Sequence, residues 1–320
     1  MRLLSSFWLC FCACLALHST LQAQVPAATP DGGPATFTTD TRLVLLPVSV
    51  ADKNGKLITT LDQKAFKVFE NGSEQPIKIF RREDVPISLG IVIDNSGSMR
   101  EKRQKVETAS LDLVKASNPQ DEVFVVNFND EAYLDVPFTN DLKKLEDGVA
   151  RIDSRGGTAM RDAISMSIDY LKEKGKKDKK VLLVVTDGND TASSGTLEKL
   201  IDRARNGEVL IYAIGLLNEE AKGEAKKAKR ALDNITKESG GLAFYPKDAT
   251  EVDKIALQVA QDIRNQYTIA YSPTIQALDG SFRQIKVTVN GPSRTATVRT
   301  RTGYYATPNG PAKKAISQNK

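Results

Sequence analysis

The chain has 320 residues, an apolar fraction of 40% and a formal net charge of +5, so it can bury the core of one large domain or two smaller ones. Basic and acidic residues are mixed along the chain. Basic side chains are not gathered with aromatic ones, which excludes an ordinary nucleic-acid interface.

Residues 1–23 have the pattern of a secretory signal peptide. Arg2 precedes a short apolar run, and small and polar residues follow up to Ala23. The apolar run is shorter than the roughly 20 residues that span a bilayer, which argues against an uncleaved membrane anchor. We therefore expect no transmembrane segment in the mature chain. The pattern predicts a secreted or periplasmic protein of the bacterial cell envelope.

Removal of this segment would restrict the chemistry of the mature protein. It contains every cysteine of the chain (Cys10, Cys12 and Cys14) and the only histidine, His18. Cysteine nucleophiles, histidine-based triads and Cys/His zinc sites are then excluded. Any metal would have to be bound by oxygen atoms, which favours Mg²⁺, with Mn²⁺ or Ca²⁺ as the other candidates.

The next two segments differ in composition. Residues 24–38 are rich in Pro, Gly, Ala and Thr and are interpreted as a flexible linker. Residues 39–84 contain strand-like runs at 43–50, 66–70 and 77–80, separated by turn signals. We therefore expect a short all-β segment there.

The pattern changes over residues 85–266, where apolar strands alternate with amphipathic helices. The strands are expected at 87–93, 123–128, 181–186 and 209–216, with an antiparallel edge strand at 132–138. The helices are expected at 101–117, 159–174, 196–205, 225–239 and 250–265. Nearly continuous Val, Ile and Leu in the strands indicates burial on both faces. This predicts an α/β domain with a doubly wound, mostly parallel sheet flanked by helices.

Strand character returns in residues 267–306. We expect this segment to pair with residues 39–84 in one small all-β sandwich, into which the α/β domain is inserted. Arg283, Lys286, Arg299 and Arg301 alternate with apolar or small residues, which predicts a half-exposed sheet with these side chains on its exposed face. The tail, residues 307–320, is expected to be disordered.

Three loops near predicted strand ends carry side-chain oxygen atoms. The first contains Asp94, Ser96 and Ser98, the second has Thr158 after two glycines, and the third contains Asp187. Ligands of open α/β sheets bind beyond the carboxyl ends of the strands, so these side chains are candidate ligands of one cation. Two other interpretations stay open: Asp94 and the serines could cap a helix beginning near Met99, and Asp187 could belong to an ordinary turn.

This combination resembles the metal-ion-dependent adhesion site (MIDAS) of von Willebrand factor type A (VWFA) domains. The family pattern is Asp-x-Ser-x-Ser, a later Thr, and an Asp after a further strand, and the resemblance covers roughly residues 85–264. It implies a Rossmann-like fold and direct coordination by Ser96, Ser98 and Thr158. It also implies that Asp94 and Asp187 act mainly through water or through hydrogen bonds to the serines, with one of them binding the cation directly in some states.

The resemblance to secreted bacterial VWFA-related proteins implies a binding or adhesion module and no enzymatic activity. A divalent cation would capture a carboxylate of a protein partner. The alternatives are a structural envelope scaffold whose cation only rigidifies the loops, and a metal-assisted hydrolase. A hydrolase would need a general base, and no motif singles one out. Nothing in the sequence specifies an oligomeric state.

Overall fold

The computed structural model describes residues 42–82, 84–150, 154–290, 296–308, 310 and 312–314. The predicted signal peptide and linker lie outside the described residues and stay predictions. Within the described ranges, no helix is both long and apolar enough to cross a membrane.

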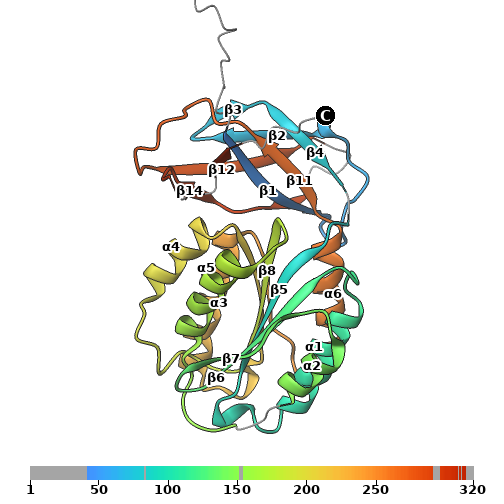
Figure 1. Cartoon of the computed structure of the whole chain (residues 1–320), viewed down its shortest axis with the longest axis vertical. Coiled ribbons are helices and arrows are strands. Elements are labelled where there is room, and N and C mark those ends of the chain that lie inside the picture. The colour runs from blue at the N-terminus through green and yellow to red at the C-terminus, as the bar shows by residue number, and fades with distance from the viewer. Residues whose placement is uncertain are drawn as a thin grey trace, which may run out of the picture. The chain divides into compact units, whose positions relative to one another are not determined.

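A six-stranded sheet with strand order β10-β9-β8-β5-β6-β7 forms the centre of the α/β region (Figure 1). Its strands are β5 (Ile87–Asp94), β6 (Glu122–Phe128), β7 (Ala132–Thr139), β8 (Lys179–Thr186), β9 (Val209–Gly215) and β10 (Ala243–Phe244). All neighbouring pairs are parallel except β6 and β7, which confirms the expected antiparallel edge strand.

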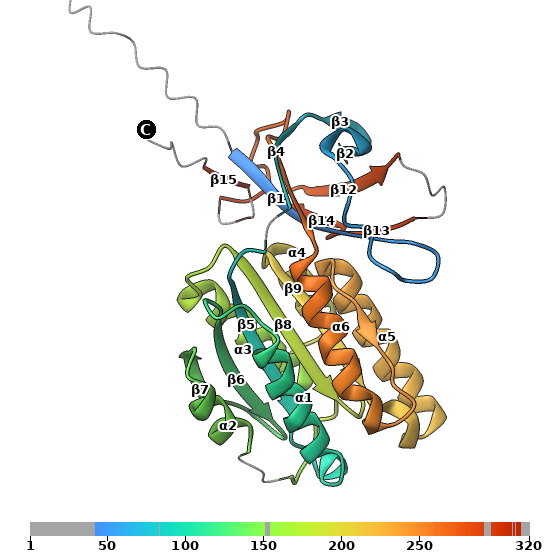
Figure 2. The ribbon, with the colours of Figure 1, turned by 90° about the vertical axis from the view of Figure 1, so that its right-hand side faces the viewer.

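Six helices cover this sheet: α1 (Arg103–Lys115), α2 (Leu142–Val149), α3 (Met160–Lys174), α4 (Leu197–Asn206), α5 (Lys222–Ser239) and α6 (Val252–Arg264). Four short 3-10 helices are η1 (Gln63–Ala65), η2 (Gly97–Met99), η3 (Leu217–Glu219) and η4 (Ala249–Glu251). One apolar cluster contains side chains of α1, α2 and α6, and a second contains side chains of α3, α4 and α5. Each cluster packs on its own face of the sheet (Figure 2), so the doubly wound architecture is confirmed.

Helix α2 is absent from the sequence-based prediction. The Asp141 side chain caps it by accepting hydrogen bonds from the N–H groups of Lys143 and Lys144. Leu145 and Val149 are its buried apolar positions. Leu142, Leu145 and Val149 have helical spacing, but the segment is only eight residues long, and capping together with packing stabilises it.

Two antiparallel sheets form the β region. One contains β1 (Arg42–Ala51), β4 (Ile77–Arg81), β11 (Tyr267–Tyr271), β13 (Thr297–Arg299) and β15 (Ala312–Lys314), and the other contains β2 (Phe66–Glu70), β3 (Ser73–Gln75), β12 (Phe282–Val289) and β14 (Gly303–Tyr305). Strands from the two ends of the chain pair directly, β1 with β11 and β2 with β12. A single apolar cluster contains side chains of both sheets, so they form one sandwich.

Two expectations for this region were wrong. Residues 312–314 of the supposedly disordered tail form β15, which pairs with Arg42–Val44 of β1. Strand β13 pairs only with Ser49–Ala51, so the beginning of β1 has an open edge that β15 satisfies.

Arg283 and Arg301, expected on an exposed face, are instead buried, with exposed fractions of 4% and 5%. Arg283 shares its strand face with buried Ile285 and pairs with Asp279. The Arg301 guanidinium donates a hydrogen bond to the Leu45 carbonyl. The Arg283 partner is four residues away, whereas the Arg301 acceptor is contributed by β1, and alternation of residue types reveals neither.

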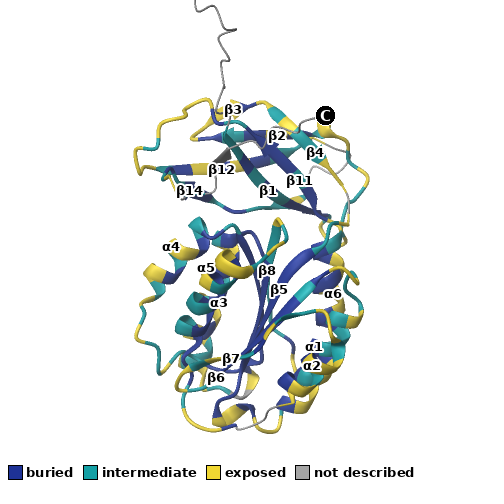
Figure 3. Cartoon of the chain, in the orientation of Figure 1, coloured by how far each residue is buried: buried dark blue, intermediate teal, exposed yellow. Residues whose placement is uncertain are grey.

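Strand β5 lies at the centre of the α/β region, and every residue of it is buried (Figure 3). The strand includes Gly90, whose missing side chain leaves room for two neighbours. A Cβ atom at this position would lie 2.3 Å from Phe124 Cζ and 2.4 Å from Leu182 Cδ2.

We expect Gly90→Ala to lower the free energy of unfolding by about 1–3 kcal/mol, because a tightly packed core must shift to accept the methyl group. Gly223→Ala is the matched control, since no atom lies within 4 Å of the added Cβ. The control should be neutral or stabilising by up to about 1 kcal/mol. Urea denaturation measures both variants, and equal stabilities would show that the β5 packing is described incorrectly.

Candidate functional site

Asp94 is the last residue of the central strand β5, and its side chain is fully buried. One carboxylate oxygen accepts a hydrogen bond from the Ser96 N–H at 2.8 Å, and the other accepts one from the Thr186 hydroxyl at 2.6 Å. Burial raises the pKa of the Asp94 carboxyl to about 6, and the nearby Asp187 charge adds to the increase, whereas the hydrogen bonds oppose it. A cation placed nearby would favour the ionised form.

The two serine hydroxyls lie between Asp94 and the next loop. Ser96 Oγ and Ser98 Oγ are 3.2 Å apart, and Ser98 Oγ donates a hydrogen bond to Asp187 Oδ1 at 2.8 Å. Ser96 is buried and Ser98 is exposed, so this cluster opens to solvent on the Ser98 side.

The serine side chains do not cap a helix. Ser96 is the N-cap residue of η2 but makes no side-chain capping hydrogen bond, and α1 begins only at Arg103, after Lys102. The capping interpretation is therefore wrong for the two serine hydroxyls, whereas Asp94 does accept the Ser96 N–H just before η2.

Asp187 directly follows β8, and its side chain is 1% exposed. Its second oxygen, Oδ2, accepts a hydrogen bond from Lys102 Nζ at 2.8 Å, which makes a buried ion pair. Sequence reasoning assigned no role to Lys102, which lies four residues after Ser98.

Thr158 is held near the serines through its backbone. The Gly97 N–H donates to the Gly156 carbonyl at 3.4 Å, which joins the serine turn to the Thr158 loop. Gly156 has a φ of +74°, and a Cβ there would lie 2.0 Å from Asp130 Oδ2, so glycine permits this close approach. Within the described residues, no hydrogen bond links the Thr158 hydroxyl to the other four candidate ligands.

The structure thus brings Asp94, Ser96, Ser98 and Asp187 into one cluster and places the Thr158 loop beside it. Among the described residues, no three His, Cys, Asp or Glu side chains gather in a way that could hold a metal ion. The oxygen donors of the cluster are instead the hydroxyl groups of Ser96 and Ser98 together with the carboxylates of Asp94 and Asp187.

Sequence comparison places the cluster in a family. The sequence model of the von Willebrand factor type A domain matches residues 89–258, which is more than half of the chain. The chain belongs to the von Willebrand factor type A domain family. Domains of this family are known for protein binding and adhesion.

Individual relatives resemble only part of the chain. Inter-alpha-trypsin inhibitor heavy chain H4 of Bos taurus is 25% identical over 174 residues, which cover 50% of this chain and 18% of that protein. Calcium-activated chloride channel regulator 1 of Mus musculus is 26% identical over 172 residues, which cover 50% of this chain and 17% of that protein. The chain therefore spans less than a fifth of the length of these relatives.

Solved structures show similarity in fold alone. Proximal thread matrix protein 1 from the mussel byssus, solved with a zinc-occupied MIDAS motif, has a TM-score of 0.49 and 18% identity. The match covers 61% of this chain and 50% of that chain.

In the VWFA domain, a set of hydrogen bonds joins the Thr158 loop to the loop after β8. The Thr158 N–H donates to Thr191 Oγ1 at 3.0 Å, and the Thr158 carbonyl accepts from the Thr191 N–H at 3.0 Å. Asp190 accepts from the Arg161 N–H at 2.7 Å and from Ser193 Oγ at 2.7 Å. This set fixes Thr158 relative to Asp187, and it gives Asp190 a positioning role that the sequence left unassigned.

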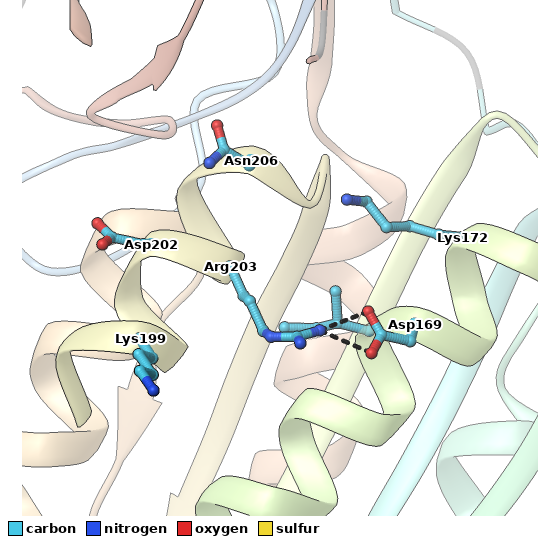
Figure 4. A pocket seen from close by; sticks show the side chains of 7 residues that line it. Asp169, Lys172, Lys199, Asp202, Arg203 and Asn206 are labelled. Atoms are coloured by element: carbon cyan, nitrogen blue, oxygen red, sulfur yellow. Dashed lines mark hydrogen bonds and ion pairs between the residues drawn. The ribbon is translucent and has the colours of Figure 1, made fainter. Parts of the chain in front are cut away.

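A second Asp–Arg pair, between α3 and α4, is a useful comparison. Asp169 and Arg203 form an ion pair at 2.6 Å with side-chain exposures of 60% and 48%. They line a depression of about 370 Å³ between α3 and α4 (Figure 4). The Asp190 side chain, in contrast, is only 5% exposed in its pair with Arg161.

We expect Asp190→Ala to lower the free energy of unfolding by about 1–3 kcal/mol, because it leaves half-buried N–H and hydroxyl donors without their acceptor. Asp169→Ala should cost about 0–1 kcal/mol, since its pair is solvated. Denaturant titration of both variants gives the comparison. Equal losses would contradict the structural role of the Asp190 contacts.

Proposed function

We propose that the VWFA domain binds a divalent cation, with Mg²⁺ favoured, through Asp94, Ser96, Ser98, Thr158 and Asp187. The bound cation captures a carboxylate of a protein partner. The proposed location is outside the cytoplasm, either secreted or in the bacterial envelope, because residues 1–23 have the signal-peptide pattern.

One observation carries the proposal: the 2.8 Å hydrogen bond from Ser98 Oγ to Asp187 Oδ1, between residues 89 positions apart. It joins the loops after β5 and β8, which are adjacent parallel strands. With Ser96 Oγ 3.2 Å from Ser98 Oγ, three oxygen-bearing side chains from two loops meet at one edge of the sheet.

The donor set fits a hard divalent cation. Mg²⁺ prefers oxygen ligands in octahedral geometry and usually keeps several waters, so it does not need a cage of carboxylates. Two carboxylates, Asp94 and Asp187, can balance its charge, and the hydroxyls of Ser96, Ser98 and Thr158 are neutral ligands. The exposed Ser98 side leaves access for a partner.

When bound, the cation would supply a Lewis-acidic centre that attracts anionic oxygen. The chain's own residues determine which side of the cation is open to a ligand. Asp94 and Asp187 are buried on the protein side, and Ser98 lies on the solvent side. The first residues of α3 follow Thr158, and the positive end of this 15-residue helix also favours an anion. These features support ligand capture rather than chemical turnover.

We expect millimolar Mg²⁺ or Mn²⁺ to raise the thermal unfolding midpoint by several degrees, since binding at about 100 times Kd contributes about 2.7 kcal/mol. Ser98→Ala and Asp94→Asn should remove most of this increase. Both changes remove a proposed ligand and are small in volume. Differential scanning calorimetry with and without EDTA measures the effect.

Ser194→Ala is the control for this experiment. Ser194 Oγ also donates to a carboxylate, Asp162 Oδ2 at 3.0 Å, but it lies outside the proposed ligand set. The control should keep the full cation response. An unchanged midpoint of the unaltered protein in all three cations (Mg²⁺, Mn²⁺ and Ca²⁺) would refute the cation site.

Carboxylate capture needs its own measurement. A fluorescein-labelled peptide containing Glu should bind the Mg²⁺-loaded protein at least tenfold more tightly than the matched peptide containing Gln. Fluorescence polarisation should show that EDTA removes this difference. A cation-dependent midpoint without any Glu preference would instead support the scaffold function, in which the cation only rigidifies the loops.

A further inference from the structure

Lys102 places a positive charge inside the proposed cation site. Its ammonium lies 2.8 Å from Asp187 Oδ2, and the two side chains are only 12% and 1% exposed. Removal from water strengthens such an ion pair relative to a surface pair. The same carboxylate accepts the Ser98 hydroxyl on its other oxygen.

The backbone holds Lys102 in this position. Its N–H donates to the Met99 carbonyl at 3.0 Å, and the Met99 side chain is fully buried under the serine turn. Its carbonyl accepts from the Lys105 N–H at 3.1 Å, at the beginning of α1. The ammonium is therefore delivered by the same ordered turn that presents Ser96 and Ser98.

The net charge of the cation-loaded site can be estimated from its side chains. Asp94 and Asp187, when both are ionised, would be neutralised by one divalent cation. The Lys102 ammonium would then give these three side chains and the cation together a net positive charge. It repels the cation but attracts an incoming anion, and both effects are strong at short range in a partly buried site.

A third carboxylate lies nearby. Glu220 Oε1 would be 3.3 Å from a Cβ atom added to Gly188, the residue after Asp187. Burial raises the pKa of the Glu220 carboxyl, the Asp187 charge raises it further, and the Lys102 charge lowers it. Glu220 thus adds a further negative charge close to Asp187.

We propose that Lys102 is a built-in counter-cation of Asp187 that weakens divalent-cation binding and strengthens binding of the carboxylate ligand. This inference rests on the proposed cation site and specifies how that site is regulated. In the cation-free protein, Lys102 holds the Asp187 carboxylate in place. In the loaded protein, its charge favours the anionic partner.

The experiment compares Lys102→Met with the unaltered protein. Isothermal titration with Mn²⁺ alone should give about tenfold tighter binding to the variant, because the competing ammonium is gone. At saturating Mn²⁺, the same variant should bind the Glu-containing peptide at least threefold more weakly. A purely structural ion pair would weaken both equilibria, so the opposite directions are diagnostic.

Two substitutions serve as controls, and a third guards against misfolding. Lys105→Met makes the same change at an exposed position on α1, and Lys102→Arg keeps the charge; both should bind Mn²⁺ as the unaltered protein does. Lys102→Gln repeats the test if Lys102→Met loses its native circular dichroism spectrum.

The outcomes separate the two proposals. If the unaltered protein binds Mn²⁺ and Lys102→Met binds it equally or more weakly, the role of Lys102 is wrong and the cation site stands. If neither the unaltered protein nor any Lys102 variant binds Mn²⁺ at millimolar concentration, both proposals fail.

Discussion

The parallel pairing of β5 with β8 is the constraint on which the candidate site depends. The register pairs Ile93 with Val185, so both strands end at the same edge of the sheet. Asp94 and Asp187 are therefore brought together although 92 residues separate Asp94 from Thr186, whose hydroxyl bridges the strand ends at 2.6 Å. The apolar clusters on both faces of the sheet maintain this register, and the loops that carry the oxygen atoms follow from it.

Concentrating carboxylates at a buried edge opposes folding, and the surrounding groups offset this cost. Asp94 receives hydrogen bonds from a hydroxyl and an N–H group, yet burial still raises its pKa to about 6. Asp187 receives the Lys102 ammonium and the Ser98 hydroxyl. Carboxylates with perturbed pKa values are frequent at functional sites, which agrees with the role proposed for Asp94.

Much of this organisation can be predicted from the sequence, because long apolar runs and amphipathic periods identify β5, β8 and helices such as α3. The spacing of Asp94, Ser96 and Ser98 indicates the first loop, and the two glycines before Thr158 indicate a close backbone approach. Lys102 could not be recognised in this way. A lysine at the start of a helix is normally solvated, and its partner Asp187 is 85 residues away. Buried Arg301 escaped prediction for the same reason, since its acceptor is the distant Leu45 carbonyl. Arg283 has a local acceptor, Asp279, and there the alternation of residue types indicated the wrong face of the strand.

The way the α/β region joins the sandwich has a consequence for protein engineering. Strand β4 ends at Arg81, just before the α/β region, and β11 begins at Tyr267, just after it. Arg81 and Thr268 are directly paired in the antiparallel β4–β11 ladder. A short turn can therefore replace everything between these two residues and convert β4 and β11 into an ordinary hairpin. The sandwich accommodates its large insertion at what is, in backbone geometry, a hairpin position.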